Sequence, residues 1–105
     1  MTMDDASSVD RDAFERVDDA TDYLKTLSHR GRLLILHHLQ DGEKSVTELE
    51  RLLDSRQAAV SQMLARLRGD ALVQTRREGK TIYYRLDDPE TGRVLDLLRQ
   101  KFAPL

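Results

Sequence analysis

Residues 55–86 of the chain read SRQAAVSQMLARLRGDALVQTRREGKTIYYRL. In the first half, Val60, Leu64 and Leu67 are spaced as i, i+4 and i+7, which places them on one face of a helix that packs against a core. The opposite face carries small and short polar side chains, which let a helix approach the floor of a DNA groove and hydrogen-bond to base edges. These residues are Ala58, Ser61, Gln62 and Ala65.

The second half predicts a β-hairpin. Residues 72–76 and 81–86 are rich in β-forming side chains, and Glu78-Gly79 between them suits a tight turn. Cationic side chains gather at its tip: Arg76, Arg77 and Lys80. Tyr83 and Tyr84 lie on alternating faces of the second strand, so we expect one in the core and the other at the surface. A helix followed by a basic hairpin indicates a winged helix-turn-helix, with the helix in the DNA major groove and the hairpin, or wing, on the backbone or in the minor groove.

The predicted order of elements is helix, helix, helix, helix, hairpin, helix, a mainly α fold of the α+β kind. The expected helix starts are Asp10, Ser28, Ser45 or Thr47, Ser55 and Asp88. All are residue types that cap helix N-termini. Residues 45–48 match a capping box, and residues 47–50 offer a second register. The last helix has Pro89 at its first position and is expected to end near Phe102.

The chain divides into a tail and one domain. Residues 1–9 predict a flexible N-terminal tail, and residues 10–105 predict a winged-helix DNA-binding domain with a dimerisation helix at each end. A domain of this size buries a modest core, so dimerisation would add burial.

The net charge of −2 is unevenly distributed. Residues 1–24 hold eight acidic and two basic side chains, and residues 55–86 hold seven basic and two acidic ones, so the segments carry −6 and +5. This asymmetry favours a nucleic-acid partner for the second segment, against the simpler interpretation of two solvated charged faces.

The composition excludes several function classes. The absence of cysteine excludes thiol nucleophiles, disulfides, Cys-ligated zinc and thiol redox sensing. No apolar run approaches the ~20 residues of a membrane span, and the acidic N-terminus does not resemble a signal peptide, so we expect a cytoplasmic protein without a membrane partner. Ser61 has no histidine placed to activate it, so we expect no enzyme, no catalytic residue and no cofactor.

Four segments carry a recognisable pattern. They are Leu27–Leu36 (LSHRGRLLIL), Ser45–Leu49 (SVTEL), Ala59–Arg68 (AVSQMLARLR) and Arg76–Leu86 (RREGKTIYYRL). In this combination the chain resembles the ArsR/SmtB family of bacterial and archaeal winged-helix repressors, nearest to its HlyU/BigR-like branch, over about residues 20–102.

The resemblance implies a homodimeric repressor that binds an inverted repeat of double-stranded DNA, with one half-site per subunit. The implied DNA-binding residues are Arg56, Gln57, Ala58, Ser61, Gln62, Arg66, Arg68, Arg76, Arg77, Lys80 and Thr81. Gln57, Ser61 and Gln62 would face bases, and the cationic side chains from Arg66 to Lys80 would hold phosphates or enter the minor groove. Met63 and Arg56 depart from the family pattern, which would alter the preferred operator.

The implied dimer interface lies on the first and last helices. Its residues are Ala13, Val17, Ala20, Leu24, Val94, Leu95, Leu98 and Phe102. The positions in the first helix form a narrow heptad seam. Their spacing leaves open whether the seam packs on its own domain or on a second copy.

The sensors of the family are absent from this sequence. Ser45-Val46-Thr47 stands where arsenic and cadmium sensors have Cys-Val-Cys, and soft metals need thiolates. The last helix has no histidine for a zinc site. The dithiol of the redox branch would fall near His37 and Ala103, which form no disulfide. The resemblance therefore leaves open an unidentified small-molecule inducer at the dimer interface, a protein partner, or none.

The histidines offer a weaker metal hypothesis. Neighbouring helical residues point about 100° apart, so His37 and His38 would not chelate one ion easily, and no metal site is expected. We expect one of them at the edge of the core and the other in solvent, and His29 exposed.

The second functional hypothesis is a winged helix used as a protein-interaction module or antirepressor, with the acidic first helix as its docking surface. The basic wing discriminates between the two, because a docking module has no need of three cations at the hairpin tip.

Overall fold

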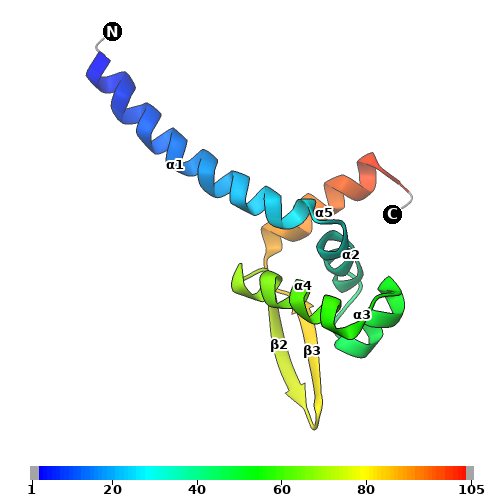
Figure 1. The fold of residues 1–105 in the computed structure, drawn as a ribbon. Helices are drawn as coiled ribbons and strands as arrows, with labels where there is room; N and C mark the ends of the chain where they lie inside the picture. Colours follow the sequence, from blue (N-terminus) through cyan, green and yellow to red (C-terminus); the bar gives the residue numbers. More distant parts are fainter. Residues whose placement is uncertain (1–2, 104–105) are drawn as a thin grey trace.

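The computed structural model of the chain describes residues 3–103, and of residues 3–10 the backbone only. Its elements are α1 (Met3–Ser28), α2 (Arg30–Leu39), β1 (Lys44–Ser45), α3 (Val46–Leu53), α4 (Gln57–Gly69), β2 (Val73–Glu78), β3 (Thr81–Leu86) and α5 (Pro89–Lys101). The predicted winged helix-turn-helix is confirmed: α3 and α4 form the helix-turn-helix, and β2 and β3 form the wing that extends from the body in Figure 1.

The sheet has one strand more than predicted. Its order is β1-β3-β2, and both pairs are antiparallel. β1 is only two residues long, which is too short for an alternating pattern to be recognised in the sequence. It joins the segment before α3 to the base of the wing, with Ser45 opposite Tyr83.

The core lies between α2, α3, α4, the base of the wing and α5. Val60, Leu64 and Leu67 are fully buried, as their spacing predicts. They meet Leu36 of α2 and Leu49 of α3 in one cluster, which holds the inner face of α4 against the body. The opposite face of α4 is therefore directed outward.

The helix starts are partly as predicted. The capping box at Ser45 and Glu48 is confirmed in the first of its two registers. Ser28 is not the N-cap of α2: α1 continues through Ser28, and the His29 ring accepts a hydrogen bond from the backbone of Arg32 at 3.3 Å. His29 thus takes the N-cap position, with an extended backbone and a side-chain acceptor for the N–H of the third helical residue.

Ser55 does not cap α4. Asp54 ends α3 in the left-handed conformation, with φ of 51°, and the chain then places Arg56 at the N-cap. The Ser55 hydroxyl instead donates to the carbonyl of Leu53 at 3.4 Å. The N-terminus of α4 consequently has no side-chain cap.

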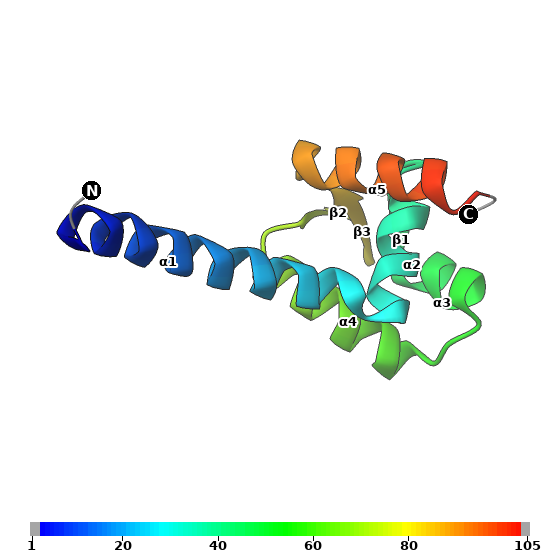
Figure 2. The ribbon, with the colours of Figure 1, turned by 90° about the horizontal axis from the view of Figure 1, so that it is seen from above.

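Helix α1 begins at Met3, earlier than the expected start at Asp10, because no Gly or Pro interrupts residues 3–9. The division expected between residues 9 and 10 therefore falls inside a helix. Figures 1 and 2 show α1 projecting far beyond the body, and every side chain from 11 to 20 is exposed. Only its last turns touch the body, through Tyr23, Thr26 and Leu27. Within residues 3–103, no helix is both long and apolar enough to cross a membrane.

Candidate nucleic-acid interface

The outer face of α4 carries the predicted base-reading residues. Ala58, Ser61, Gln62 and Ala65 are all exposed, and so are Arg56 and Gln57 at the start of the helix. The first turn of α4 contains no acidic residue. Its free backbone N–H groups and positive dipole end therefore favour an approaching phosphate.

Met63 lies on the flank of α4 that faces α2. Its side chain is half-buried, and it occupies the space over Gly31 that a Cβ atom there would enter. Met63 does not belong to the exposed outer face of α4. Its expected effect on operator preference would therefore act through the packing of α4 on α2.

The wing tip presents cations to solvent. Arg77, Lys80 and Thr81 are exposed, and the turn uses Gly79 in the left-handed conformation, with φ of 63°. Arg77 donates from Nε to the carbonyl of Gly79 at 3.1 Å, and within residues 11–103 neither Arg77 nor Lys80 forms an ion pair. Both charges therefore remain available to an anion.

Arg76 is held by its own chain. Its Nε donates to both carboxylate oxygens of Glu43, at 2.8 and 2.9 Å, and a second nitrogen donates to the same group. Nη1 donates to Glu78 at 2.8 Å, and the guanidinium lies 4.5 Å from the centre of the Tyr83 ring. Hydrogen bonding to Arg76 lowers the pKa of Glu43, and the two carboxylates raise the pKa of Arg76. Arg76 thus reaches across the sheet from β2, over β3, to the residue before β1.

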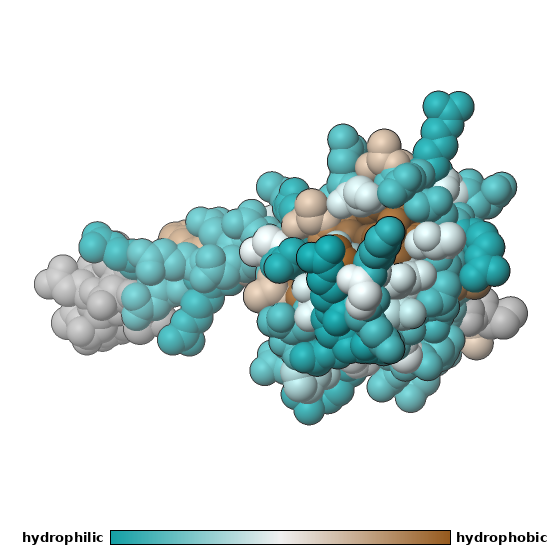
Figure 3. Space-filling view, turned by 90° about the horizontal axis from the view of Figure 1, so that it is seen from below, coloured by the Kyte–Doolittle hydropathy of each residue, from teal (hydrophilic) through white to brown (hydrophobic). Residues whose placement is uncertain are grey.

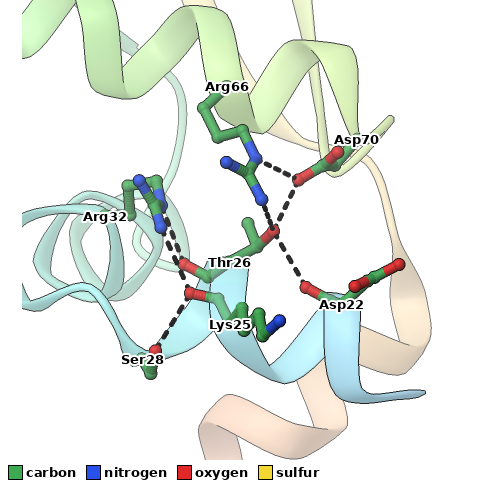
Figure 4. A network of polar contacts seen from close by, with 7 residues as sticks. All are labelled: Asp22, Lys25, Thr26, Ser28, Arg32, Arg66 and Asp70. Carbon is green, nitrogen blue, oxygen red and sulfur yellow. Dashed lines mark hydrogen bonds and ion pairs between the residues drawn. The ribbon is translucent and has the colours of Figure 1, made fainter. Parts of the chain in front are cut away.

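Arg66 is also engaged within the chain, at the C-terminal end of α4 (Figure 4). Its Nε donates to Asp70 at 3.0 Å, and Nη2 lies 3.4 Å from the hydroxyl of Thr26 in α1. Thr26 is 1% exposed and donates to Asp70 at 2.6 Å. This hydrogen bond is the main cause that lowers the pKa of Asp70, and the contact with Arg66 adds to it. Arg32 completes the network by donating to the carbonyl of Thr26 at 2.9 Å.

The predicted cations therefore fall into two groups. Arg68 is exposed and forms no ion pair within residues 11–103, like Arg77 and Lys80. Arg66 and Arg76 are bound to carboxylates of the same chain. Sequence reasoning missed both carboxylates, Glu43 and Asp70. Glu43 lies 33 residues from Arg76, so nothing in the local pattern indicates that contact, whereas Asp70 follows Arg66 by four residues, a pairing that helical spacing indicates.

The expected interface residues of α1 are exposed. Val17 and Leu24 are each 58% exposed, and Ala13 and Ala20 are exposed as well. Leu27, the next position at the same spacing, is 5% exposed and packs in the core of its own domain. Packing of the exposed part of the seam on a second copy stays a prediction. Phe14, which was not predicted, is 69% exposed beside it. A stripe through positions 14, 17, 21 and 24 has the same heptad spacing, so this signal was present in the sequence.

One residue of α5, Leu95, was wrongly expected at the dimer interface. Leu95 is 3% exposed and belongs to the core of its own chain, so it has no surface left for a partner. Leu97, which was not predicted, is 62% exposed and Phe102 is 57% exposed, whereas Val94 and Leu98 are half-buried. The apolar residues of α5 encircle much of the helix, and spacing alone does not tell which of them face the core.

The histidines and tyrosines differ in part from expectation. His29 is exposed, as expected, but His37 and His38 are both half-buried, so neither lies free in solvent. Burial and the neighbouring His37 lower the pKa of His38, and Nδ1 of His37 lies 3.0 Å from Arg99. Within residues 3–103, no three histidine or carboxylate side chains are grouped to hold a metal.

Tyr83 and Tyr84 are both half-buried. Tyr84 packs against the core, as expected for one of the pair, and Tyr83 lies beneath Arg76. Seen from the side to which the wing points, the molecule is mostly hydrophilic, with hydrophobic residues visible only in small areas (Figure 3). This surface suits a polar, charged partner.

Comparison with known proteins gives consistent results. The sequence profile described as bacterial regulatory protein, arsR family, matches residues 29–75. The biofilm growth-associated repressor of Agrobacterium fabrum is 46% identical over 80 residues, which cover 76% of this chain and 68% of the relative. The transcriptional activator HlyU of Vibrio cholerae is 43% identical over 80 residues, which cover 76% of this chain and 74% of the relative.

Solved structures agree with these sequence relationships. Reduced HlyU from Vibrio cholerae superposes with a TM-score of 0.83 at 38% identity, covering 89% of this chain and 98% of that one. The transcriptional repressor BigR from Xylella fastidiosa superposes with a TM-score of 0.80 at 37% identity, covering 90% and 97% of the two chains.

Proposed function

The chain belongs to the ArsR family of bacterial regulatory proteins and is a DNA-binding transcriptional regulator, and from this premise we propose that it represses transcription as a homodimer on an inverted-repeat operator. The observation that carries the proposal is the pairing of an exposed small-polar face on α4 with free cations at the wing tip. Neither feature serves the core, and together they fit a groove and the phosphates beside it.

In the proposed complex, α4 enters the major groove. Gln57, Ser61 and Gln62 contact base edges, and Ala58 allows the helix to approach closely. Arg56 and Arg68 contact phosphates at the two ends of α4. Arg77, Lys80 and Thr81 of the wing contact the backbone or the minor groove. These are exposed positions, and Arg66 and Arg76 support them from within the chain.

The dimer is proposed to form through α1 and α5. Phe14, Val17 and Leu24 of α1, with Leu97 of α5 and Phe102 at its C-cap, are each more than half exposed in the described part of the chain. A two-fold symmetric pair would bury them and would place two copies of α4 at half-sites about one helical turn, roughly 34–36 Å, apart. Two such subunits explain an inverted-repeat operator.

The names of the relatives bear on the sign of regulation. They include the biofilm growth-associated repressor of Agrobacterium fabrum and the repressor PagR of Bacillus anthracis, besides the activator HlyU of Vibrio cholerae. We therefore favour repression, in the cytoplasm where bacterial DNA lies, without catalytic activity. The alternative of a protein-interaction module or antirepressor is not favoured, because these relatives are named as regulators of transcription.

Salt dependence of DNA binding tests the proposal. The affinity for a duplex from the chain's own promoter should fall steeply between about 50 and 200 mM salt, because several phosphates are neutralised. Fluorescence anisotropy across this range measures the slope. A flat response would contradict the electrostatic role of the wing.

Two substitutions separate base reading from phosphate contact. Gln62→Ala should lose about 1–3 kcal/mol on the operator and little on a scrambled duplex, whereas Arg77→Ala should weaken both equally. Equal loss on both duplexes for Gln62→Ala would remove Gln62 from the base-reading set.

A further inference from the structure

A cavity of about 290 Å³ lies between α2 and α5, on elements that take no part in the proposed DNA contacts. Its walls include four leucine side chains, Leu33 and Leu34 of α2 and Leu95 and Leu98 of α5, together with the polar side chains of His37 and Gln40. The volume lies near the lower limit of the roughly 300–1,000 Å³ typical of small-molecule sites. The size and the apolar walls suit the hydrocarbon part of a small ligand.

The edge of the cavity is cationic. Arg30 begins α2, is exposed, and forms no ion pair within residues 11–103. Arg99 of α5 is oriented by His37, with Nη2 at 3.0 Å from Nδ1 and 3.2 Å from the carbonyl oxygen. Its nearest carboxylate, Asp41, is 3.7 Å away, which is at the limit of an ion pair. A guanidinium group held in this way has donors to offer to an anion.

We propose that this cavity binds a small apolar carboxylic acid, with the hydrocarbon part between the leucines and the carboxylate at the arginine edge. The charge at the edge selects an anion over a neutral or cationic molecule. Since the chain has no thiol, recognition at this place depends on burial and ion pairing and forms no covalent bond.

The position of the cavity gives the ligand a route to the DNA-reading helix. Helix α2 packs directly on α3 and α4, so a ligand that separates α2 from α5 acts on the element that supports α4. A second copy bound to α5 would not need to fill the cavity, because Leu97 points about 200° away from Leu95 around the helix. The regulatory consequence rests on the proposed function, but the binding does not.

Calorimetric titration of the whole purified chain with octanoate tests the site, with octanol and octylamine as neutral and cationic probes. We expect octanoate to bind more tightly than octanol and octylamine not to bind. Arg99→Gln and Arg30→Gln should each weaken octanoate, with a loss of about tenfold for Arg99→Gln, and should leave octanol unchanged. The control Arg93→Gln removes the same charge from an exposed α5 residue outside the cavity and should change nothing.

Filling the cavity provides the second measurement. Leu98→Trp should abolish the binding of both octanoate and octanol, and Leu34→Phe serves the same purpose if the tryptophan variant fails to fold. The proposal is overturned if octanoate still binds to both Leu98→Trp and Leu34→Phe. It is also overturned if neither Arg99→Gln nor Arg30→Gln changes the affinity for octanoate. The proposal is also overturned if the chain binds no octanoate and Leu98→Trp dissociates the dimer. In that case a second copy of the chain, and not a small ligand, would occupy the cavity.

DNA binding measured on the same samples keeps the two proposals separate. Operator binding without octanoate binding refutes the ligand site alone. Octanoate binding without operator binding refutes the proposed function alone.

Discussion

At the residue scale, Arg76 and Arg77 are adjacent and chemically identical but have different surroundings. Arg77 extends at the wing tip without an ion pair in the described part of the chain. Arg76 lies over Tyr83 and binds Glu43 through two nitrogens. Because this contact joins β2 to the residue before β1, we interpret Arg76 as a residue that positions the wing.

Substitution of the pair distinguishes positioning from phosphate contact. If Arg76 positions the wing, Arg76→Gln and Glu43→Gln should each weaken operator binding several-fold, and the double variant should lose no more than either single one. The salt slope should stay unchanged in all three variants. Arg77→Gln should lower the slope by about 0.9, as expected for one lost phosphate contact.

An increase in operator affinity for Glu43→Gln would contradict this interpretation. If Arg76 contacted phosphate, removal of the Glu43 charge would release a cation and strengthen binding. Lys80→Gln is the matched control, because it removes a wing cation that has no carboxylate partner within residues 11–103.

At the element scale, the polar network in Figure 4 joins the end of α1 to the end of α4. Thr26 is buried in α1, and its hydroxyl donates to the carboxylate of Asp70, the C-cap of α4. The helix proposed to form the dimer and the helix proposed to read DNA are thus held together by one short side-chain contact.

Acid should weaken this contact. The pKa of Asp70 is lowered in the folded chain, so its contribution to stability is complete above the ordinary value of 3.8 and is lost as pH falls through the lower folded value. Asp70→Asn should therefore reduce the free energy of unfolding by about 1 kcal/mol at neutral pH, a figure reduced for the partial exposure of the carboxylate. Denaturant titrations between pH 7 and 2 should show this difference shrinking below pH 4.

Thr26→Val tests the same bond from α1. It keeps the volume of the buried side chain and removes the donor, so the variant should lose a similar amount at neutral pH. Thr21→Val is the matched control, since Thr21 is exposed and donates only to Val17 of its own helix. If Thr21→Val and Thr26→Val reduce the free energy of unfolding equally, the effect comes from the stability of helix α1 and not from the bond to Asp70.

At the scale of the whole molecule, the single chain is elongated, with extents of 61 × 31 × 22 Å. The length comes from α1, which projects beyond the body in Figure 2. Its apolar stripe, made by Phe14, Val17 and Leu24, is exposed. Exposed valine, leucine and phenylalanine in one stripe raise the free energy of an isolated chain. A second copy that covers the stripe removes this cost.

Charging the stripe should dissociate the dimer. Val17→Lys replaces a 58% exposed side chain, so the fold of each chain should survive. Burial of such a side chain contributes about 1.5–3 kcal/mol and occurs twice in a symmetric dimer, so the dissociation constant should rise at least tenfold. Sedimentation equilibrium measures this change, and operator affinity should fall with it.

Glu15→Lys is the control for Val17→Lys, because it adds the same side chain to the polar face of α1. If both variants remain dimeric, α1 is not the dimerisation helix.

The sequence by itself determined the helix-turn-helix, the wing and the inner face of α4. These depend on contacts between residues close in the chain, as in the spacing of Val60, Leu64 and Leu67 or the capping box of Ser45. Local periodicity and turn chemistry therefore report them.

Only the tertiary structure decided which of the predicted residues are free to bind. Arg76 meets Glu43 across 33 residues, and Thr26 meets Asp70 across 44. It also placed Leu95 in the core and left Phe14, Val17 and Leu24 of α1 more than half exposed. These contacts and exposures depend on which surfaces meet after folding. The spacing of residues within one helix or strand carries no information about a side chain that a distant segment places against it.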